Sequence, residues 1–134
     1  MSKLSIGLAQ LNSNDSISRN LSQIIELINS LSGSVDIVFF PENSLFFRIN
    51  EGESVQYLNY ASNEFRQLAK LCLQKKIAIH LGSVAMNVGG QPTNSSVIIT
   101  STGKVIKSYS KLHLFDIQLN NEKAIKESDS FRPG

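Results

Sequence analysis

Hydrophobic and polar positions alternate along the chain in blocks that predict strands and helices in turn. Apolar residues dominate residues 4–11 and 35–40, as in buried strands. Between these two runs, apolar side chains recur every three or four residues, which predicts one buried helix face. These side chains are Ile17, Leu21, Ile24, Ile28 and Leu31. Asp15 or Ser16 can cap this helix. A strand, an amphipathic helix and a second strand predict a βαβ unit with parallel neighbouring strands.

The rest of the chain predicts a second helix and then strands that turn back on each other. We expect a helix over residues 56–75, followed by a strand over residues 76–86. The predicted buried stripe of this helix consists of Ala61, Phe65, Leu68 and Cys72. Apolar segments at residues 95–100 and 104–115 flank a short turn and predict an antiparallel hairpin. Residues 117–134 predict loop, with a short helical turn around residues 122–128. Parallel and antiparallel pairs together indicate a mixed sheet in an α/β fold.

Composition narrows the class of protein. A chain of 134 residues fits one domain, and its 41% hydrophobic and 18% charged residues are typical of a soluble globular protein. The net charge of +2, without a basic stripe, argues against nucleic-acid partners. No window approaches the length of a membrane span, and one cysteine excludes an internal disulfide framework. These features predict a cytoplasmic domain with no membrane or nucleic-acid partner.

A few polar residues stand where chemistry could occur. Glu42 directly follows the second predicted strand, where parallel sheets gather ligands, although it could also be a solvated loop residue or a helix cap. Lys111 lies within an apolar run, so it is either an edge charge facing water or a partly buried ammonium that needs a carboxylate. In a regular strand, His113 would lie on the same face as Lys111. His113 and His80 lie far apart without a carboxylate array, so no metal site is predicted. Cys72 reads as a small core residue.

Several separated segments, in their order and approximate spacing, resemble one enzyme family. They are "IGLAQL", "DIVFFPEN", "HLGSV", "NSSVIIT", "YSKLHLFD" and "ESDSFRPG". Over its whole length the sequence resembles the carbon–nitrogen hydrolases of the nitrilase superfamily, and the last two segments are most similar to the Nit branch, which includes ω-amidase and deaminated glutathione amidase. The resemblance implies the mixed-sheet half of a four-layer αββα sandwich. It also implies hydrolysis of small amides next to a carboxylate, with no cofactor and with association into homo-oligomers.

The resemblance further implies a catalytic Glu–Lys–Cys set with an assisting glutamate. Glu42 in "FPEN" matches the first glutamate, the general base, and Lys111 in "YSKLHLFD" matches the lysine. Glu127 in "KESDSFRPG" matches the second glutamate. In such a set a base activates the thiol for attack on the amide carbon, and the lysine stabilises the oxyanion that develops. A glutamate-activated water then hydrolyses the thioester.

The main departure from the family pattern concerns the nucleophile. In the family the nucleophilic cysteine lies beyond the "PG" segment, and Cys72 does not match that position. Ser110 stands where many relatives have arginine, which affects a side-chain contact and not the role of Lys111. We therefore expect residues 1–134 to be the N-terminal part of a hydrolase domain, truncated before the nucleophile. By itself this part should expose a sheet edge and an apolar face, self-associate and be inactive toward amides.

Two other functions remain open at this point. The same half-fold could be a non-catalytic pseudoenzyme or interaction module that pairs with another chain, with Glu42 and Lys111 as relics. A flavodoxin-like binding domain is a second possibility, but it predicts a glycine-rich phosphate loop after the first strand. The segment "QLNSNDS" contains no glycine, which disfavours that reading.

Overall fold

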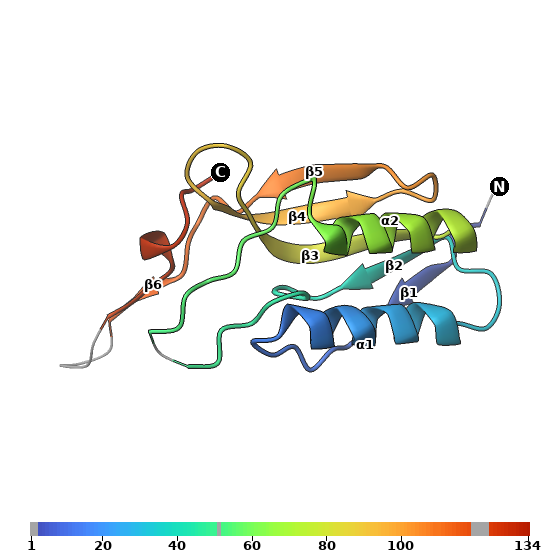
Figure 1. Ribbon diagram of the computed structural model, residues 1–134, viewed down its shortest axis with the longest axis horizontal. Helices are drawn as coiled ribbons and strands as arrows, with labels where there is room; N and C mark the ends of the chain where they lie inside the picture. Colours follow the sequence, from blue (N-terminus) through green and yellow to red (C-terminus); the bar gives the residue numbers. More distant parts are fainter. Residues whose placement is uncertain (1–2, 51, 119–123) are drawn as a thin grey trace.

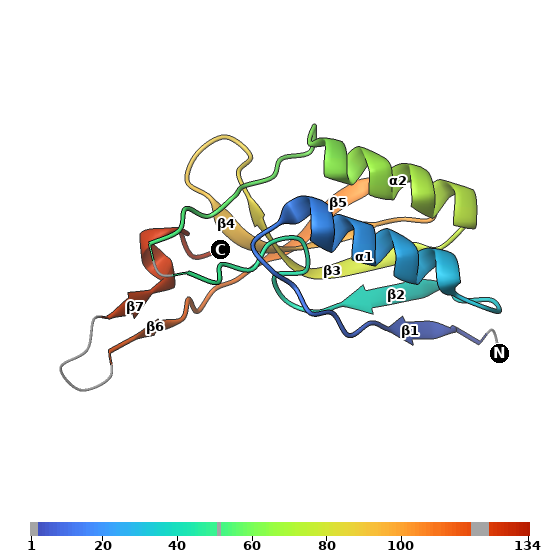
Figure 2. The same ribbon diagram turned by 60° about the horizontal axis from the view of Figure 1, so that its bottom comes forward.

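The chain folds as a mixed sheet with both of its long helices on one face. The computed structural model describes residues 3–50, 52–118 and 124–134. Its elements are β1 (Ile6–Leu8), α1 (Ile17–Ser30), β2 (Ile37–Phe40), α2 (Asn63–Lys75), β3 (Ala78–Met86), β4 (Thr93–Ile99), β5 (Val105–Ser110), β6 (Asp116–Ile117), β7 (Ile125–Lys126) and the 3-10 helix η1 (Glu127–Asp129). Figures 1 and 2 show α1 and α2 side by side over the same face of the sheet. The predicted α/β class is confirmed.

The strand order determines which chain segments meet at each end of the sheet. The five main strands lie in the order β1-β2-β3-β4-β5. Strands β1, β2 and β3 are parallel, whereas β4 is antiparallel to both β3 and β5. The carboxyl ends of β2 and β5 and the start of β4 therefore lie at one end of the sheet. The small β6–β7 ribbon and the C-terminus lie at this end as well (Figure 1).

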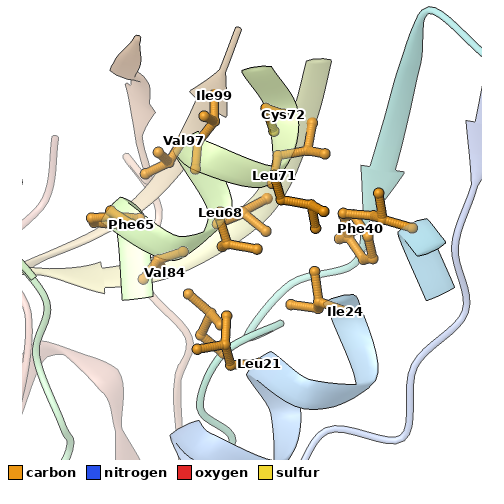
Figure 3. Close-up of a cluster of buried hydrophobic side chains, with 14 of the residues drawn as sticks. Leu21, Ile24, Phe40, Phe65, Leu68, Leu71, Cys72, Val84, Val97 and Ile99 are labelled. Carbon is orange, nitrogen blue, oxygen red and sulfur yellow. The ribbon is translucent and has the colours of Figure 1, made fainter. Parts of the chain in front are cut away.

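The helices and the sheet enclose the hydrophobic core (Figure 3). The stripe predicted for the first helix is buried at Leu21, Ile24 and Ile28, and the Ser16 hydroxyl caps this helix by accepting from the Arg19 N–H. Phe65 and Leu68 of α2 are fully buried against the same face of the sheet. Each such side chain contributes roughly 1.5–3 kcal/mol through its removal from water. The amphipathic patterns thus fix which face of each helix is buried.

The second helix is shorter than its sequence predicts. It begins at Asn63 rather than at residue 56, and Ala61 is exposed instead of lying on the buried stripe. Leu58 forms an isolated parallel bridge with Met86, which holds this segment extended beside β3. The Asn59 side chain then accepts a hydrogen bond from the Ala61 N–H. Such a local turn competes with helix, so the helix starts only after it.

The last long strand also ends earlier than predicted. It was expected to continue to residue 115, but β5 stops at Ser110. The Lys111 N–H still donates to the Asn94 carbonyl, but the Lys111 carbonyl accepts from the terminal Gly134 N–H. Because Lys111 and His113 follow the strand, the premise for a shared strand face fails, and His113 is exposed. In the tail, the helical turn predicted around residues 122–128 is present only at its end, as η1, because Ile125–Lys126 form the strand β7. Residues 122 and 123 of that prediction lie outside the described residues.

The sheet face opposite the helices carries a continuous apolar row. Leu8, Phe39, His80, Ile98 and Ile106 are direct cross-strand partners, one from each of the five strands. Leu8 is 85% exposed, and the Phe39 ring lies 5.0 Å from the His80 ring. Val38 and Phe40, which flank Phe39, point to the opposite face, into the core. A row of this kind is an exposed apolar patch in the isolated chain.

We expect the 134-residue chain, expressed by itself, to self-associate through this apolar row. Replacing both Leu8 and Phe39 with glutamate should shift the chain toward monomer in analytical ultracentrifugation, because charged side chains oppose burial of that face. Leu73→Glu is the matched control, since Leu73 is an exposed leucine on α2. A chain that is monomeric over the whole concentration series, or an equal response to Leu73→Glu, would contradict this prediction.

Candidate active site

Three charged side chains from distant parts of the chain meet at the end of the sheet. Glu42 follows β2, Lys111 follows β5, and Glu127 opens η1. The Lys111 ammonium nitrogen lies 2.9 Å from Glu127 Oε2 and 3.3 Å from Glu42 Oε1. The structure therefore brings together the three residues that the sequence resemblance singled out. It leaves Cys72 apart from them, in the core, and His113 exposed.

The backbone around Glu42 is held by a close approach between two strands. Asn43 adopts a left-handed conformation with φ of 56°, and its N–H donates to the Ser83 hydroxyl at 3.1 Å. The Ser44 hydroxyl donates to the Pro41 carbonyl. A Cβ atom at Gly82 would lie 2.6 Å from the Phe40 carbonyl oxygen, so only glycine lets β3 pass this close to the end of β2. These contacts fix the direction in which Glu42 leaves the strand.

A fourth residue, Asn94 on β4, joins the two glutamates. Its side-chain Nδ2 donates to Glu42 Oε1 at 3.0 Å and to Glu127 Oε1 at 2.8 Å. Sequence reasoning missed Asn94 as a site residue, although Asn94 begins the family segment "NSSVIIT". The available signal was that Thr93, Asn94 and Ser95 are consecutive polar residues at the start of a strand whose second half is strongly apolar. All three are buried, and a buried polar side chain requires a partner.

The charges stabilise one another in their ionised forms. The pKa of Lys111 is raised, chiefly by its hydrogen bond to Glu127, against partial burial, with the negative charge of Glu42 adding to the rise. Burial alone would raise the pKa of Glu127. The hydrogen bonds from Lys111, the Phe115 N–H and Asn94 outweigh burial and hold this pKa below its ordinary value of 4.5. Lys111 is therefore a fixed cation at neutral pH, and Glu127 a fixed anion.

A cavity of about 490 Å³ opens onto these charges. Its lining includes Glu42, Lys111 and Glu127, and Arg48 adds a second cation. The remaining wall is mainly apolar and aromatic: Phe46, Phe47, Val55, Phe115, Ile125 and Phe131. A site with apolar walls and a few convergent polar groups suits a small organic molecule that has a polar reacting group.

Cys72 cannot act as a nucleophile in this fold. It is buried between α2 and the sheet, and that burial raises the pKa of its thiol to about 12 (Figure 3). The thiolate is the reactive form, so a buried thiol of this kind is inert. Within the described residues, no group of three or more histidine, cysteine or acidic side chains could hold a metal ion.

We expect Cys72 to resist thiol reagents in the folded chain. A pKa raised from 9.0 to about 12 lowers the thiolate fraction at neutral pH about a thousandfold, and burial blocks access as well. The measurement is the rate of reaction with an aromatic disulfide reagent, with the unfolded chain in guanidinium as the control. Rapid labelling of the folded chain, at the rate of the unfolded one, would refute the core assignment.

Comparison with known proteins shows the family to which the chain belongs. The family model of the carbon-nitrogen hydrolases matches residues 5–134, nearly the whole chain. The chain belongs to the carbon-nitrogen hydrolase family. It is 34% identical to the probable hydrolase nit2 of Schizosaccharomyces pombe over 92% of this chain and 46% of that protein. It is 29% identical to the deaminated glutathione amidase of Yersinia enterocolitica over 100% of this chain and 49% of that enzyme. The family expected from the sequence is confirmed.

Solved structures of carbon-nitrogen hydrolases share this fold. The Caenorhabditis elegans NitFhit protein aligns with a TM-score of 0.74 and 21% identity over 98% of this chain and 34% of that one. A Nesterenkonia amidase of the nitrilase superfamily aligns with a TM-score of 0.72 and 18% identity over 98% of this chain and 48% of that one. These likenesses confirm the nitrilase-like fold, of which this chain forms the mixed-sheet half.

The chain spans about half the length of the curated relatives it matches. In the described part of this member of the carbon-nitrogen hydrolase family, no helix combines the length and the apolar character that crossing a membrane requires.

Proposed function

We propose that this chain supplies the base, the lysine and the second glutamate of an amidase that hydrolyses small amides, and that the nucleophilic cysteine lies outside residues 1–134. The single observation that carries the proposal is the position of Lys111 between two carboxylates on the lining of a largely apolar cavity. A cation fixed in this way can stabilise an oxyanion, and a carboxylate beside it can move protons.

The hydrogen bonds support different roles for the two glutamates. Both contacts of Glu42 fall on Oε1, and among the described residues no hydrogen bond reaches its Oε2. Glu127 accepts from Asn94 on Oε1, and from Lys111 and the Phe115 N–H on Oε2. Both oxygens of Glu127 are therefore occupied. We assign Glu42 as the general base, through its free oxygen, and Glu127 as the residue that holds Lys111.

The reaction then proceeds in two halves. Glu42 takes the proton from the thiol, the thiolate attacks the amide carbon, and Lys111 stabilises the oxyanion. When the carbon–nitrogen bond breaks, Glu42 returns the proton to the leaving ammonia and a thioester remains. Glu42 next takes a proton from water, which attacks the thioester carbon. The carbon–sulfur bond breaks, and the thiol recovers its proton from Glu42 as the carboxylic acid leaves.

For the substrate, we propose a small amide that also carries a carboxylate. Relatives named deaminated glutathione amidase and omega-amidase support an amide substrate. Arg48 supports the carboxylate, because it adds a cation to the lining of a cavity whose other cation is already paired with Glu42 and Glu127. The cytoplasmic location and the homo-oligomeric state expected from the sequence stay predictions.

The test begins with the nucleotide sequence downstream of codon 134. The proposal expects the reading frame to continue into a segment with a cysteine. The complete protein encoded by that frame, called the full product below, should release ammonia from glutaramate, a small amide with a carboxylate. Butyramide, which lacks the carboxylate, is the matched control and should react more slowly. A frame that ends without a cysteine, or a full product inert toward both amides, would instead favour the non-catalytic interaction module. The only cysteine of this chain, Cys72, is a core residue, and that observation keeps this second candidate open.

A further inference from the structure

We propose that Asn94 is a positioning residue that holds the two glutamates around Lys111. Asn94, Glu42, Lys111 and Glu127 form a closed ring, because Lys111 and Asn94 each contact both carboxylates. The Asn94 side chain is 4% exposed, so water does not compete for its hydrogen bonds. This inference rests on the proposed function for its meaning in the reaction.

The two carboxylates determine which way round the Asn94 amide lies. Both of its N–H groups point at carboxylate oxygens, and turning the amide over would place its oxygen against two negative charges. In this orientation Oδ1 is buried and has no hydrogen-bond partner among the described residues. An unpaired buried acceptor opposes folding. The fold tolerates this cost at Asn94, where both side-chain N–H groups bind the two glutamates.

The ring has a consequence for the free oxygen of Glu42. Asn94 and Lys111 both bind Oε1, and this pins the carboxylate in one rotation and leaves Oε2 to receive a proton. The contact with Lys111 alone, at 3.3 Å to a side chain that is 56% exposed, would allow Glu42 to swing into water. Asn94 thus supplies the second anchor that makes the base point into the cavity.

Other charged groups near the ring also influence its ionisation. The charged members of the ring itself come from the segments after β2 and β5 and from η1. Asp116, whose pKa is lowered mainly by the Ser128 N–H, lies beside η1. Further out are Arg48 on the cavity lining and Arg132, which contacts the segment just before β4. All of these groups remain unchanged in variants of Asn94, so the comparison with the unaltered chain isolates the ring.

The experiment measures unfolding of the 134-residue chain by circular dichroism between about pH 7 and about pH 3, with all variants at one fixed chain concentration, because self-association makes stability depend on concentration. Because Asn94 donates to ionised Glu127, its loss raises the folded pKa of Glu127. The stabilisation by Glu127 is present above its ordinary pKa and is lost as the pH falls through the lower folded value. Asn94→Leu should therefore lose less stability on acidification than the unaltered chain. The two stability curves should converge at low pH.

Asn94→Asp gives the sharper result, because it places a third carboxylate against two others beside one ammonium. Like charges this close cannot all ionise, so this variant should become more stable as the pH falls from about 7 to about 5, a range in which the Glu127 contribution leaves the unaltered chain nearly constant. Asn87→Asp, at an exposed asparagine, is the matched control and should follow the unaltered chain. If each Asn94 variant differs in stability from the unaltered chain by the same amount at every pH, Asn94 has a merely structural role and the proposal is overturned.

A second readout separates this proposal from the proposed function. In the full product, Asn94→Asp should lower kcat about 100-fold with little change in KM and move the acid limb of the pH–rate profile upward. If the full product hydrolyses amides and the Asn94 variants match it in rate and profile, the positioning role alone fails. If the full product is inert while the Asn94 variants change the pH dependence of stability as expected, the amidase assignment fails and the positioning role of Asn94 is retained.

Discussion

Glu42→Gln is expected to lower kcat/KM for glutaramate by about 10²- to 10⁴-fold in the full product, while the fold is retained. Glutamine keeps an oxygen for Asn94 and Lys111 but cannot take a proton from the thiol or from water. The fold should survive because the Glu42 side chain is 56% exposed, and an exposed ion pair contributes only about 0–1 kcal/mol. Lys111 also keeps its shorter contact with Glu127, at 2.9 Å.

The control for this substitution is Glu26→Gln, at an exposed glutamate of α1. It should leave both turnover and the unfolding midpoint unchanged. Equal loss of activity in both variants would point to a general effect of charge. Full activity of Glu42→Gln would remove the assignment of Glu42 as base, whatever the fate of the other residues.

Gly82→Ala is expected to destabilise the chain by about 1–3 kcal/mol and to lower the turnover of the full product about 100-fold. The added Cβ would lie 2.6 Å from the Phe40 carbonyl oxygen and 2.7 Å from the Pro41 carbonyl carbon. Both are backbone atoms, which cannot rotate away, so the end of β2 must move. Glu42 follows Pro41 directly and would move with it, away from Lys111 and Asn94.

Gly7→Ala is the matched control, since it makes the same change on β1, the other neighbour of β2. There the new Cβ would lie 3.2 Å from a methyl group of the Val38 side chain, a neighbour that can adjust by a few tenths of an ångström. Urea unfolding of the two variants measures the difference. A Gly82→Ala variant as stable and active as Gly7→Ala would show that the close approach of β3 does not position Glu42.

Much of the fold was predictable because its signals are local. The three- and four-residue spacing from Ile17 to Ile28 gave the buried face of α1 directly. The apolar segments gave β2, β3 and the β4–β5 hairpin, and hence the mixed sheet. The errors fell where a distant contact overrides the local pattern. Leu58 pairs with Met86 instead of beginning a helix, and Lys111 follows the end of β5.

The candidate site divides in the same way. From position alone, Glu42 could equally be a solvated loop residue and Lys111 an edge charge. Only the ordered set of family segments indicated that both, together with Glu127, are site residues. Asn94 escaped notice because nothing near it in the sequence indicates that its partners lie 52 and 33 residues away. Its role depends on where β4 begins relative to the end of β2.

The sequence by itself determined the family, the helix faces and the types of residue available for chemistry, because periodicity and motif order are properties of the chain. Only the tertiary structure decided that one ammonium would be shared by two carboxylates and that an asparagine would close the ring. Burial of the sole cysteine, by contrast, was predicted from the apolar stripe of the second helix and is confirmed. The physical reason is that strand order and register bring residues far apart in the chain within hydrogen-bond distance, where they affect one another's orientation and ionisation.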